Sequence, residues 1–206
     1  MAGLPAGTGW SECSVTNVNS SRVSPFLALV ACAASLVMML AACGSATETA
    51  TAANACPTAA PENGGTPEWT LPGTAGSVAV TAPTDTTAPN IKVDAPFSVT
   101  ETQVHTLQAG DGPVVADTAM ASVCYVGVNG RDGAVFDSSY QRGAPVEFPL
   151  TGVVPGFQKA IAGQTVGSAV AVAMTSADGY PDGQPGAGIQ PGDTLIFAIK
   201  ILGASS

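Results

Sequence analysis

The pattern of hydrophobic and polar positions divides the 206-residue chain into three parts. Residues 26–42 form an apolar run in which Ser35 is the only polar side chain. Residues 44–95 consist mostly of Ala, Thr, Pro, Gly and Ser, with almost no apolar periodicity. From about residue 96 the chain changes to short apolar stretches separated by turn signals, which is typical of a folded domain.

The third part predicts several β-strands. Residues 119–128 alternate in the manner of a strand, and they are followed by the strong turn signals Asn129-Gly130 and Asp132-Gly133. Shorter apolar stretches predict further strands at 146–150, 168–175 and 194–202.

One short helix is predicted among these strands, at residues 155–163. Pro155 suits its first turn and Gly163 its C-terminal cap. Phe157 and Ile161 are four residues apart and would form a narrow apolar stripe. Several strands and one helix in residues 96–206 predict a single α+β domain.

The apolar run at residues 26–42 is 17 residues long, whereas a membrane span needs about 20. The run therefore predicts an export signal. Arg22 is the only basic residue before Lys92 and stands just ahead of this run, as in signal peptides. The run ends in Leu40-Ala41-Ala42-Cys43, which resembles a bacterial lipobox. That resemblance implies a signal peptide over residues 1–42, cleavage before Cys43 and a lipid on the Cys43 thiol. An uncleaved anchor is the alternative, and either form exports the C-terminal part.

The middle part, residues 43–95, predicts a flexible linker that follows the lipidated cysteine. Its composition buries too little apolar surface to offset chain entropy. A tether of about 50 residues would span about 40 Å on average. The richness in Thr and Pro leaves glycosylation open as an alternative role. Trp69 and Cys56 are interpreted as linker residues, the latter as a free thiol. The first ~20 residues fit no part of a signal peptide and suggest a start site assigned too far upstream.

Composition narrows the chemistry further. The net charge of −9 has the wrong sign for contact with nucleic-acid phosphates, so nucleic-acid binding is not expected. The five cysteines form no CxxC pair and no zinc spacing, and a disulfide framework is not expected either. They are Cys13, Cys32, Cys43, Cys56 and Cys124.

No motif for metal, phosphate or nucleophilic chemistry is complete. Asp178 opens a segment that resembles a calcium loop, but Ile189 stands where the loop needs glutamate. His105 is the single histidine, and no Gly-x-Ser-x-Gly elbow occurs. We therefore expect neither a metal nor a cofactor.

Ordered segments of the third part resemble the FKBP-type peptidyl-prolyl isomerases. The resemblance runs collinearly from about residue 97 to 203. It is carried by Val123-Cys-Tyr-Val-Gly127, Asp132-Gly-Ala-Val-Phe-Asp-Ser-Ser139, Val153-Val-Pro-Gly-Phe157, Gly179-Tyr180 and Asp193-Thr-Leu-Ile-Phe197. It implies a twisted antiparallel sheet wrapped around one short helix.

The resemblance also implies a proline pocket and its residues. Its walls would be Tyr125, Phe136, Phe157 and Phe197, with Val153 and Val154 as the floor and the Val154 N–H binding a substrate carbonyl. Phe157 stands where the family often has tryptophan.

Polar groups at the pocket are implied in the same way. Asp137 matches the carboxylate near the twisting carbonyl, with Arg142 as its partner, and the Tyr180 hydroxyl would donate to the substrate. Val146 replaces a common aromatic residue, and Ile189 would line the rim.

The function that follows from the resemblance is peptidyl-prolyl cis-trans isomerisation of exported polypeptides outside the bacterial cytoplasmic membrane. The implied partners are proline-containing polypeptides, the membrane through lipid on Cys43, and macrolides such as tacrolimus or rapamycin. The protein itself is expected to be a monomer. Pro181 and Asp182 follow Tyr180 where the family usually has glycine, which bears on substrate preference. A non-catalytic binding or chaperone module on the same fold is the alternative.

Overall fold

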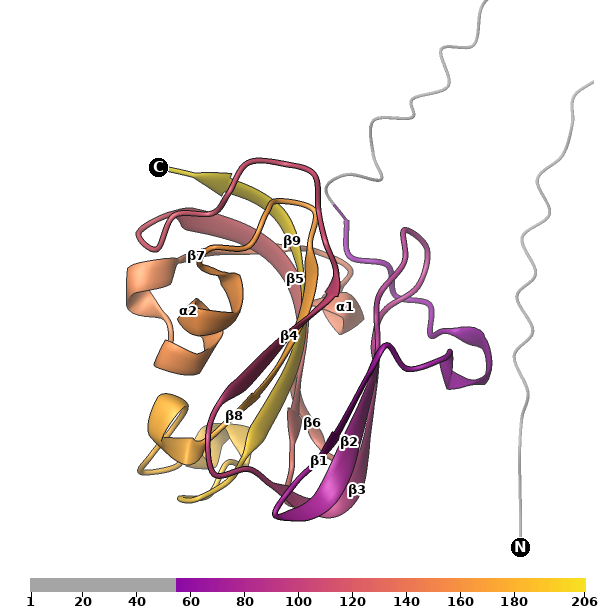
Figure 1. Cartoon of the computed structure of the whole chain (residues 1–206), viewed down its shortest axis with the longest axis vertical. Coiled ribbons are helices and arrows are strands. Elements are labelled where there is room, and N and C mark those ends of the chain that lie inside the picture. The colour runs from indigo at the N-terminus through magenta and orange to yellow at the C-terminus, as the bar shows by residue number, and fades with distance from the viewer. Residues whose placement is uncertain (1–54) are drawn as a thin grey trace, which may run out of the picture. The chain divides into compact units, whose positions relative to one another are not determined.

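The computed structural model describes residues 55–206 as two packed antiparallel sheets with a helix on the outer face of one of them (Figure 1). The predicted signal peptide, Cys43 and the first part of the predicted linker lie outside these residues. Within residues 55–206, no helix is long and apolar enough to cross a membrane.

The larger sheet has six strands, in the order β4-β8-β9-β5-β6, with β7 also paired to β5. All of its pairings are antiparallel, and the longest joins β5 to β9 from Met120↔Ser205 to Asn129↔Leu195. The strands are β4 (Gln103–Gln108), β5 (Met120–Asn129), β6 (Val135–Ser138), β7 (Val146–Pro149), β8 (Ala169–Met174) and β9 (Leu195–Ser205).

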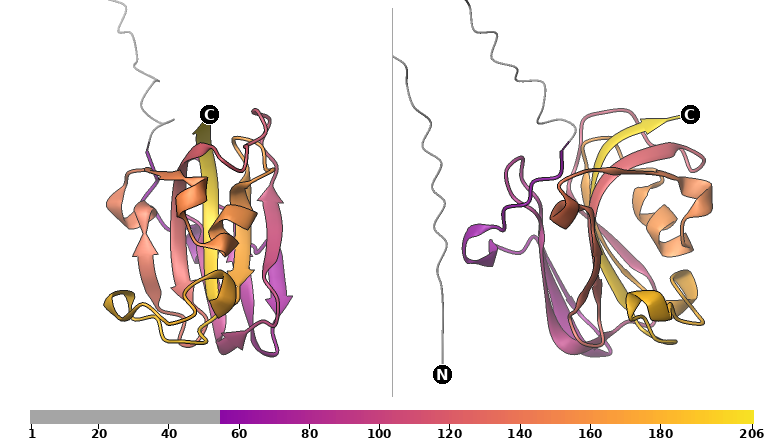
Figure 2. Two further views of the ribbon diagram at one scale, coloured as in Figure 1. Left: turned by 90° about the vertical axis from the view of Figure 1, so that its left-hand side faces the viewer. Right: turned by 180° about the vertical axis from the view of Figure 1, so that it is seen from behind.

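Helix α2 (Pro155–Ile161) covers one face of this sheet (Figure 2). A second helix, α1 (Ser139–Arg142), is a single turn between β6 and β7 whose N-cap Ser138 accepts from the Gln141 N–H. The strands predicted at 119–128, 146–150, 168–175 and 194–202 and the helix predicted at 155–163 correspond to β5, β7, β8, β9 and α2. The predicted fold class is confirmed.

Strands β8 and β9 are buried on both faces. Every residue of β8 is buried, because Val170, Val172 and Met174 face α2 while Ala171 and Ala173 face the opposite way. Such strands read as continuous apolar runs rather than as alternating ones. The second face is covered by a sheet that was not expected.

That smaller sheet is built from residues predicted to be linker. It contains β1 (Trp69–Pro72), β2 (Ala75–Thr81) and β3 (Asn90–Ser98), in the order β1-β2-β3. The buried side chains of this sheet are Val78, Val80 and Phe97, each at most 2% exposed. They pack on Ile196 and on the small side chains of β8 and β9. The boundary at residue 96 and the flexible linker over residues 55–95 were therefore wrong.

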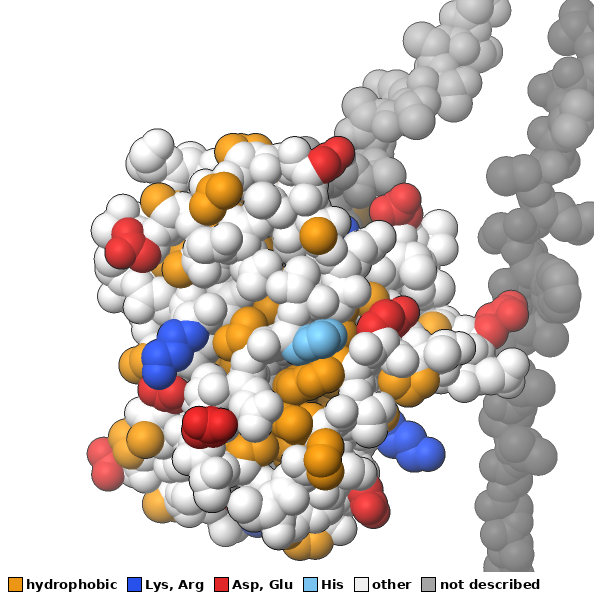
Figure 3. Space-filling view, viewed as in Figure 1, with side chains coloured by type: hydrophobic (Ala, Val, Ile, Leu, Met, Phe, Trp, Pro, Cys, Tyr) orange, Lys and Arg blue, Asp and Glu red, His pale blue; other side chains and the backbone are white. Residues whose placement is uncertain are grey.

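The physical reason is the composition of both faces in contact. A few well-placed apolar residues on β2 and β3 are enough, because they pack on the small side chains of Ala171, Ala173 and Ala198. Trp69 also belongs to the folded unit, since its ring stacks on His105 of β4 with centroids 5.5 Å apart. In Figure 3 the histidine lies among hydrophobic side chains on this side of the molecule.

A disulfide joins Cys56 to Cys124 of β5, across 68 residues of sequence, with their Cα atoms 5.6 Å apart. The expectations of a free linker thiol and of no disulfide were wrong. Cys124 faces away from the cavity side of β5, as its alternation with Tyr125 requires, and it joins the segment before η2 (Glu62–Gly64) to the sheet.

Candidate functional site

A cavity of about 370 Å³ lies between the larger sheet and helix α2. Its walls come from β5, β6, β7, β9, the N-terminal part of α2 and the loop between β8 and β9. The lining residues are Tyr125, Phe136, Asp137, Phe148, Gly152, Val153, Val154, Phe157, Tyr180 and Phe197.

Aromatic rings form most of the wall, and four of the ring pairs meet nearly at right angles. Phe197 packs edge-on against Phe136 and Phe157, with centroid distances of 5.4 and 5.3 Å. Phe157 is also edge-on to Tyr125 and Phe148. Since ring edges carry partial positive charge and ring faces partial negative charge, this arrangement is itself favourable. Together the rings line an apolar depression.

The close approach of two rings depends on Gly127 in β5. A Cβ at this position would lie 2.6 Å from Cζ of Phe136 and 2.7 Å from Cε1 of Phe197. Any larger residue would push these rings apart. The glycine of the Tyr-Val-Gly segment therefore shapes the cavity from beneath.

Asp137 is the charged group at the edge of the cavity. Its carboxylate accepts from the Tyr125 hydroxyl and forms an ion pair with Arg142, whose Nη1 lies 2.5 Å from Oδ1. Nη2 of Arg142 lies 3.2 Å from the Tyr125 hydroxyl oxygen. The pairing that the sequence predicted between Asp137 and Arg142 is present.

This triad fixes the protonation of its members. Burial alone would raise the pKa of Asp137, but hydrogen bonds from Tyr125 and Arg142 outweigh burial and hold it below its ordinary value. Burial, together with the hydrogen bond to Asp137, raises the pKa of Tyr125 to about 12. At neutral pH the site therefore contains an anion and a neutral phenol.

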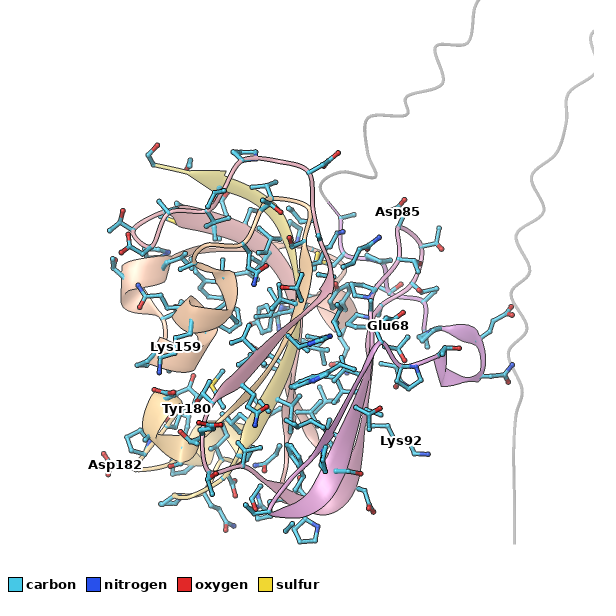
Figure 4. The ribbon with its side chains drawn as sticks, in the orientation of Figure 1. Glu68, Asp85, Lys92, Lys159, Tyr180 and Asp182 are labelled. Carbon is cyan, nitrogen blue, oxygen red and sulfur yellow. A yellow bond between two sulfur atoms is a disulfide. The ribbon has the colours of Figure 1, made fainter. Side chains whose placement is uncertain are left out.

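Tyr180 reaches the cavity from the long loop between β8 and β9. It follows the turn η4 (Ser176–Asp178), and its carbonyl accepts from the Gly183 N–H at 3.0 Å. Asp178, two residues before Tyr180, forms an ion pair with Lys159 of α2 at 2.7 Å. Figure 4 shows Tyr180 and Lys159 on the side of the sheet that carries α2.

Three expected site residues do not line the cavity. Ile189 is 3% exposed and packs into the core rather than at the rim. Val146 packs on the same core without reaching the cavity, and Arg142 acts on it only through Asp137 and Tyr125. The other residues predicted for the pocket all line it.

Phe148 and Gly152 line the cavity but were not predicted. Phe148 is two residues after Val146 on β7, so both side chains point to the same face of the strand. The alternation along residues 146–149 could have identified it. Gly152 ends the short turn η3 (Leu150–Gly152), and no sequence signal distinguishes it from other turn glycines.

The described residues offer no cluster of three or more His, Cys, Asp or Glu side chains that could hold a metal ion. What the cavity presents is an apolar floor, ring edges and one paired carboxylate. Such a site can bind an apolar ring that lies next to a carbonyl group. A sheet wrapped around one helix with this cavity between them has the architecture expected for the FKBP class.

Comparison with known proteins matches residues 112–202 to the family described as FKBP-type peptidyl-prolyl cis-trans isomerase. The chain is 38% identical over 96 residues to the FK506-binding protein of Streptomyces anulatus, covering 45% of this chain and 77% of that protein. It is also 38% identical over 100 residues to the FKBP-type 22 kDa peptidyl-prolyl cis-trans isomerase of Escherichia coli K12, covering 48% of each. The chain belongs to the FKBP-type peptidyl-prolyl cis-trans isomerase family.

This chain spans only about half the length of relatives such as the 22 kDa isomerase of Escherichia coli. Among solved structures, that of FkpA from Escherichia coli is 31% identical, with a TM-score of 0.47, and the match covers 50% of this chain and 48% of that one. The smaller sheet precedes the segment that the family description covers.

Proposed function

We propose that this protein catalyses cis-trans isomerisation of X-Pro peptide bonds in the aromatic cavity. The observation that carries the proposal is the cavity itself: ring walls from Tyr125, Phe136, Phe157 and Phe197 beside the paired carboxylate of Asp137, in a member of this family.

The reaction needs no acid, base or metal. Rotation about an X-Pro bond loses amide resonance, and the barrier is about 18–20 kcal/mol. A dry cavity removes the water that stabilises the planar, polar amide and favours the twisted transition state. Each ~1.4 kcal/mol gained only in the twisted state speeds the rotation tenfold. The polar groups have to position and polarise rather than transfer protons.

Each lining residue then has a role in holding the twisting amide. The proline ring lies on Phe157 and Phe197, and ring edges face the carbonyl oxygen before the proline and hold it in position. The Val154 N–H donates to a further substrate carbonyl, and the Tyr180 hydroxyl donates near the rotating bond. Val153 closes the floor.

Asp137 acts at the same carbonyl through its field. As resonance is lost, negative charge moves from the carbonyl oxygen back to the proline nitrogen. The nearby carboxylate then repels the oxygen less, which favours the twisted state over the planar one. Arg142 and Tyr125 keep this carboxylate ionised and in place.

We further propose that the protein works outside the cytoplasm, held to the outer face of the membrane by lipid on Cys43. The sequence Leu40-Ala41-Ala42-Cys43 after an apolar run supports this. The Cys56–Cys124 disulfide supports it independently, because disulfides persist in oxidising compartments. The substrates would be exported polypeptides with accessible prolines.

The Streptomyces relative is named for FK506, so a macrolide such as tacrolimus is a further ligand that the aromatic cavity would accept. No feature of the described residues calls for a partner subunit, and we propose a monomer.

The test is the isomerisation rate of a short prolyl peptide with and without the purified chain. Uncatalysed exchange takes roughly 10–100 s at 25 °C, and the protein should shorten it at micromolar concentration. Tacrolimus should abolish the acceleration. Peptide binding without acceleration would instead establish the non-catalytic module on the same fold.

A further inference from the structure

The loop between β8 and β9, residues 175–194, carries Tyr180 to the cavity although it has little regular structure. Its organised parts are η4 and the three-residue turn η5 (Pro185–Ala187). A loop of this length, rich in Gly and Pro, has a large conformational entropy and needs external contacts to hold one shape. Ile189 supplies one such contact by burying its side chain in the core.

A second contact is a hydrogen-bonded cluster around the carboxylate of Asp193. Oδ2 of Asp193 accepts from Nδ2 of Asn129 at 2.6 Å and from the Gln190 N–H at 2.8 Å. Nε of Arg131 lies 3.2 Å from Oδ1, and Nη2 of Arg131 donates to the Gly188 carbonyl at 3.0 Å. Asp193 itself is 8% exposed.

Only donors surround this carboxylate, so it is held as an anion. Burial would raise the pKa of Asp193, but the hydrogen bonds from Asn129, Gln190 and Arg131 together keep it below its ordinary value. Asn129 and Arg131 belong to the end of β5 and the turn after it. The cluster therefore ties that turn to the end of the loop.

Backbone hydrogen bonds continue from the cluster to Tyr180. Gly188 and Gln190, which the cluster holds, flank Ile189. Ile189 exchanges backbone hydrogen bonds with Gln184 in both directions, at 2.8 and 3.1 Å. The neighbouring Gly183 donates to the Tyr180 carbonyl at 3.0 Å.

We infer that Arg131 and Asp193 are positioning residues, which hold the loop so that the Tyr180 side chain stays at the cavity. The expected effect on catalysis rests on the proposed function. The expected effect on the order of the loop does not, because it can be measured on the protein without substrate. The sheet does not need the cluster, since β5 and β9 are already paired from Met120 to Asn129. Losing the cluster should loosen the loop rather than the fold.

The first test is hydrogen–deuterium exchange of the full chain with Arg131→Ala. The Arg131 side chain is 37% exposed, so the variant should fold. Exchange of the Gly183 and Gln190 amides should rise about tenfold, while β5 and β9 keep their protection. Asp193→Asn, which keeps the shape of the side chain, should do the same.

The matched control is Asp132→Asn. Asp132 is the other carboxylate paired with Arg131, at 2.9 Å, and among the described residues it forms no hydrogen bond to the loop. Its Oδ1 accepts from the Ala134 N–H, and asparagine retains that acceptor. Loop exchange should stay at the wild-type rate. If Arg131→Ala and Asp132→Asn leave loop exchange equally unchanged, the cluster does not hold the loop and the inference fails.

The second test is a double-mutant cycle on isomerisation. In the wild type, Tyr180→Phe should lower kcat/KM by about two- to twelvefold, the value of one hydrogen bond. With Arg131→Ala already present, the same substitution should change kcat/KM by less than about twofold, because the hydroxyl is no longer in place. Equal losses in both backgrounds would overturn the positioning role, even if exchange in the loop rises.

The two tests separate this inference from the proposed function. If the wild type does not accelerate isomerisation, the proposed function fails and loop exchange alone decides the inference. Faster loop exchange in Arg131→Ala with an unchanged Asp132→Asn control would then still support it.

Discussion

At the scale of single residues, the site combines one fixed anion with ring walls. Asp137 is ion-paired to Arg142 and accepts from the Tyr125 hydroxyl, so three side chains from β5, β6 and α1 form a unit. Their function is proposed to be electrostatic, and its parts can be separated by substitution.

Asp137→Ala should lower kcat/KM for a prolyl peptide about five- to thirtyfold, through kcat rather than KM. The carboxylate is proposed to act in the twisted state, and the loss of such an interaction lowers kcat and kcat/KM alike. Steady-state kinetics on folded protein, checked by circular dichroism, give the answer. A wild-type kcat would remove Asp137 from the proposed mechanism.

Gly127→Ala should widen the cavity and raise KM, because the new Cβ would meet Phe136 and Phe197 at less than 3 Å. We expect kcat/KM to fall by at least tenfold, with a loss of stability of about 1–3 kcal/mol. Gly186→Ala is the control, since a Cβ there has nothing within 4 Å. Similar kinetics in both variants would contradict the role assigned to Gly127.

At the scale of elements, the smaller sheet stabilises the larger one by covering its second face. Phe97 of β3 is 2% exposed and packs on β8 and β9 with Val78 and Val80. Phe97→Ala should reduce the free energy of unfolding by about 3–5 kcal/mol, as for other buried aromatic residues. Chemical denaturation measures it.

The control for Phe97→Ala is Val104→Ala on β4, where the side chain is 38% exposed. That variant should stay within about 0.5 kcal/mol of the wild type. If both substitutions have the same small effect, β1 to β3 do not form a packed layer on the larger sheet.

The disulfide makes a second contribution at this scale. It closes a loop of 68 residues, for which chain entropy gives a stabilisation of about 4 kcal/mol. Guanidinium denaturation with and without dithiothreitol should differ by this amount. A variant with Cys56→Ser and Cys124→Ser should denature identically in both conditions, and a wild type insensitive to the reductant would show that this disulfide is not formed.

The sequence predicted the cavity better than it predicted the second layer, and the reason lies in the residues. Phe136, Asp137, Phe157 and Phe197 stand in distinctive blocks at fixed spacing. The face that receives β1 to β3 is made of Ala171, Ala173, Ile196 and Ala198, which read as an ordinary strand interior.

No local sequence pattern predicted the disulfide or the hydrogen-bonded cluster around Asp193. The Cys56 N–H donates to the Gly143 carbonyl beside α1, and this placement next to Cys124 is not specified by spacing alone. The Asn129–Asp193 contact likewise joins residues 64 positions apart. Only the three-dimensional arrangement brings these groups together.

At the scale of the whole molecule, the proposed lipid on Cys43 would keep the folded unit at the membrane. Cys43→Ala should leave an unprocessed precursor without lipid, because only a cysteine thiol can take the thioether. Labelling cells with a radioactive fatty acid compares the two forms. Equal labelling of wild type and variant would contradict lipidation at Cys43.

The pH dependence of catalysis shows most directly whether the cavity works without a titrating acid or base. The pKa of Asp137 is held below its ordinary value, and the pKa of Tyr125 is raised to about 12 by burial and by its hydrogen bond to Asp137. Asp137 therefore stays ionised and Tyr125 neutral between about pH 5 and pH 9.

The measurement is kcat/KM for a prolyl peptide across that pH range, with the uncatalysed rate recorded at each point. A cavity that works by desolvation and a fixed field should give a flat profile, well above the uncatalysed rate throughout. A bell-shaped profile with an inflection inside this range would show that a titrating acid or base drives the reaction. That result, or a rate no faster than that of the free peptide, would contradict the account.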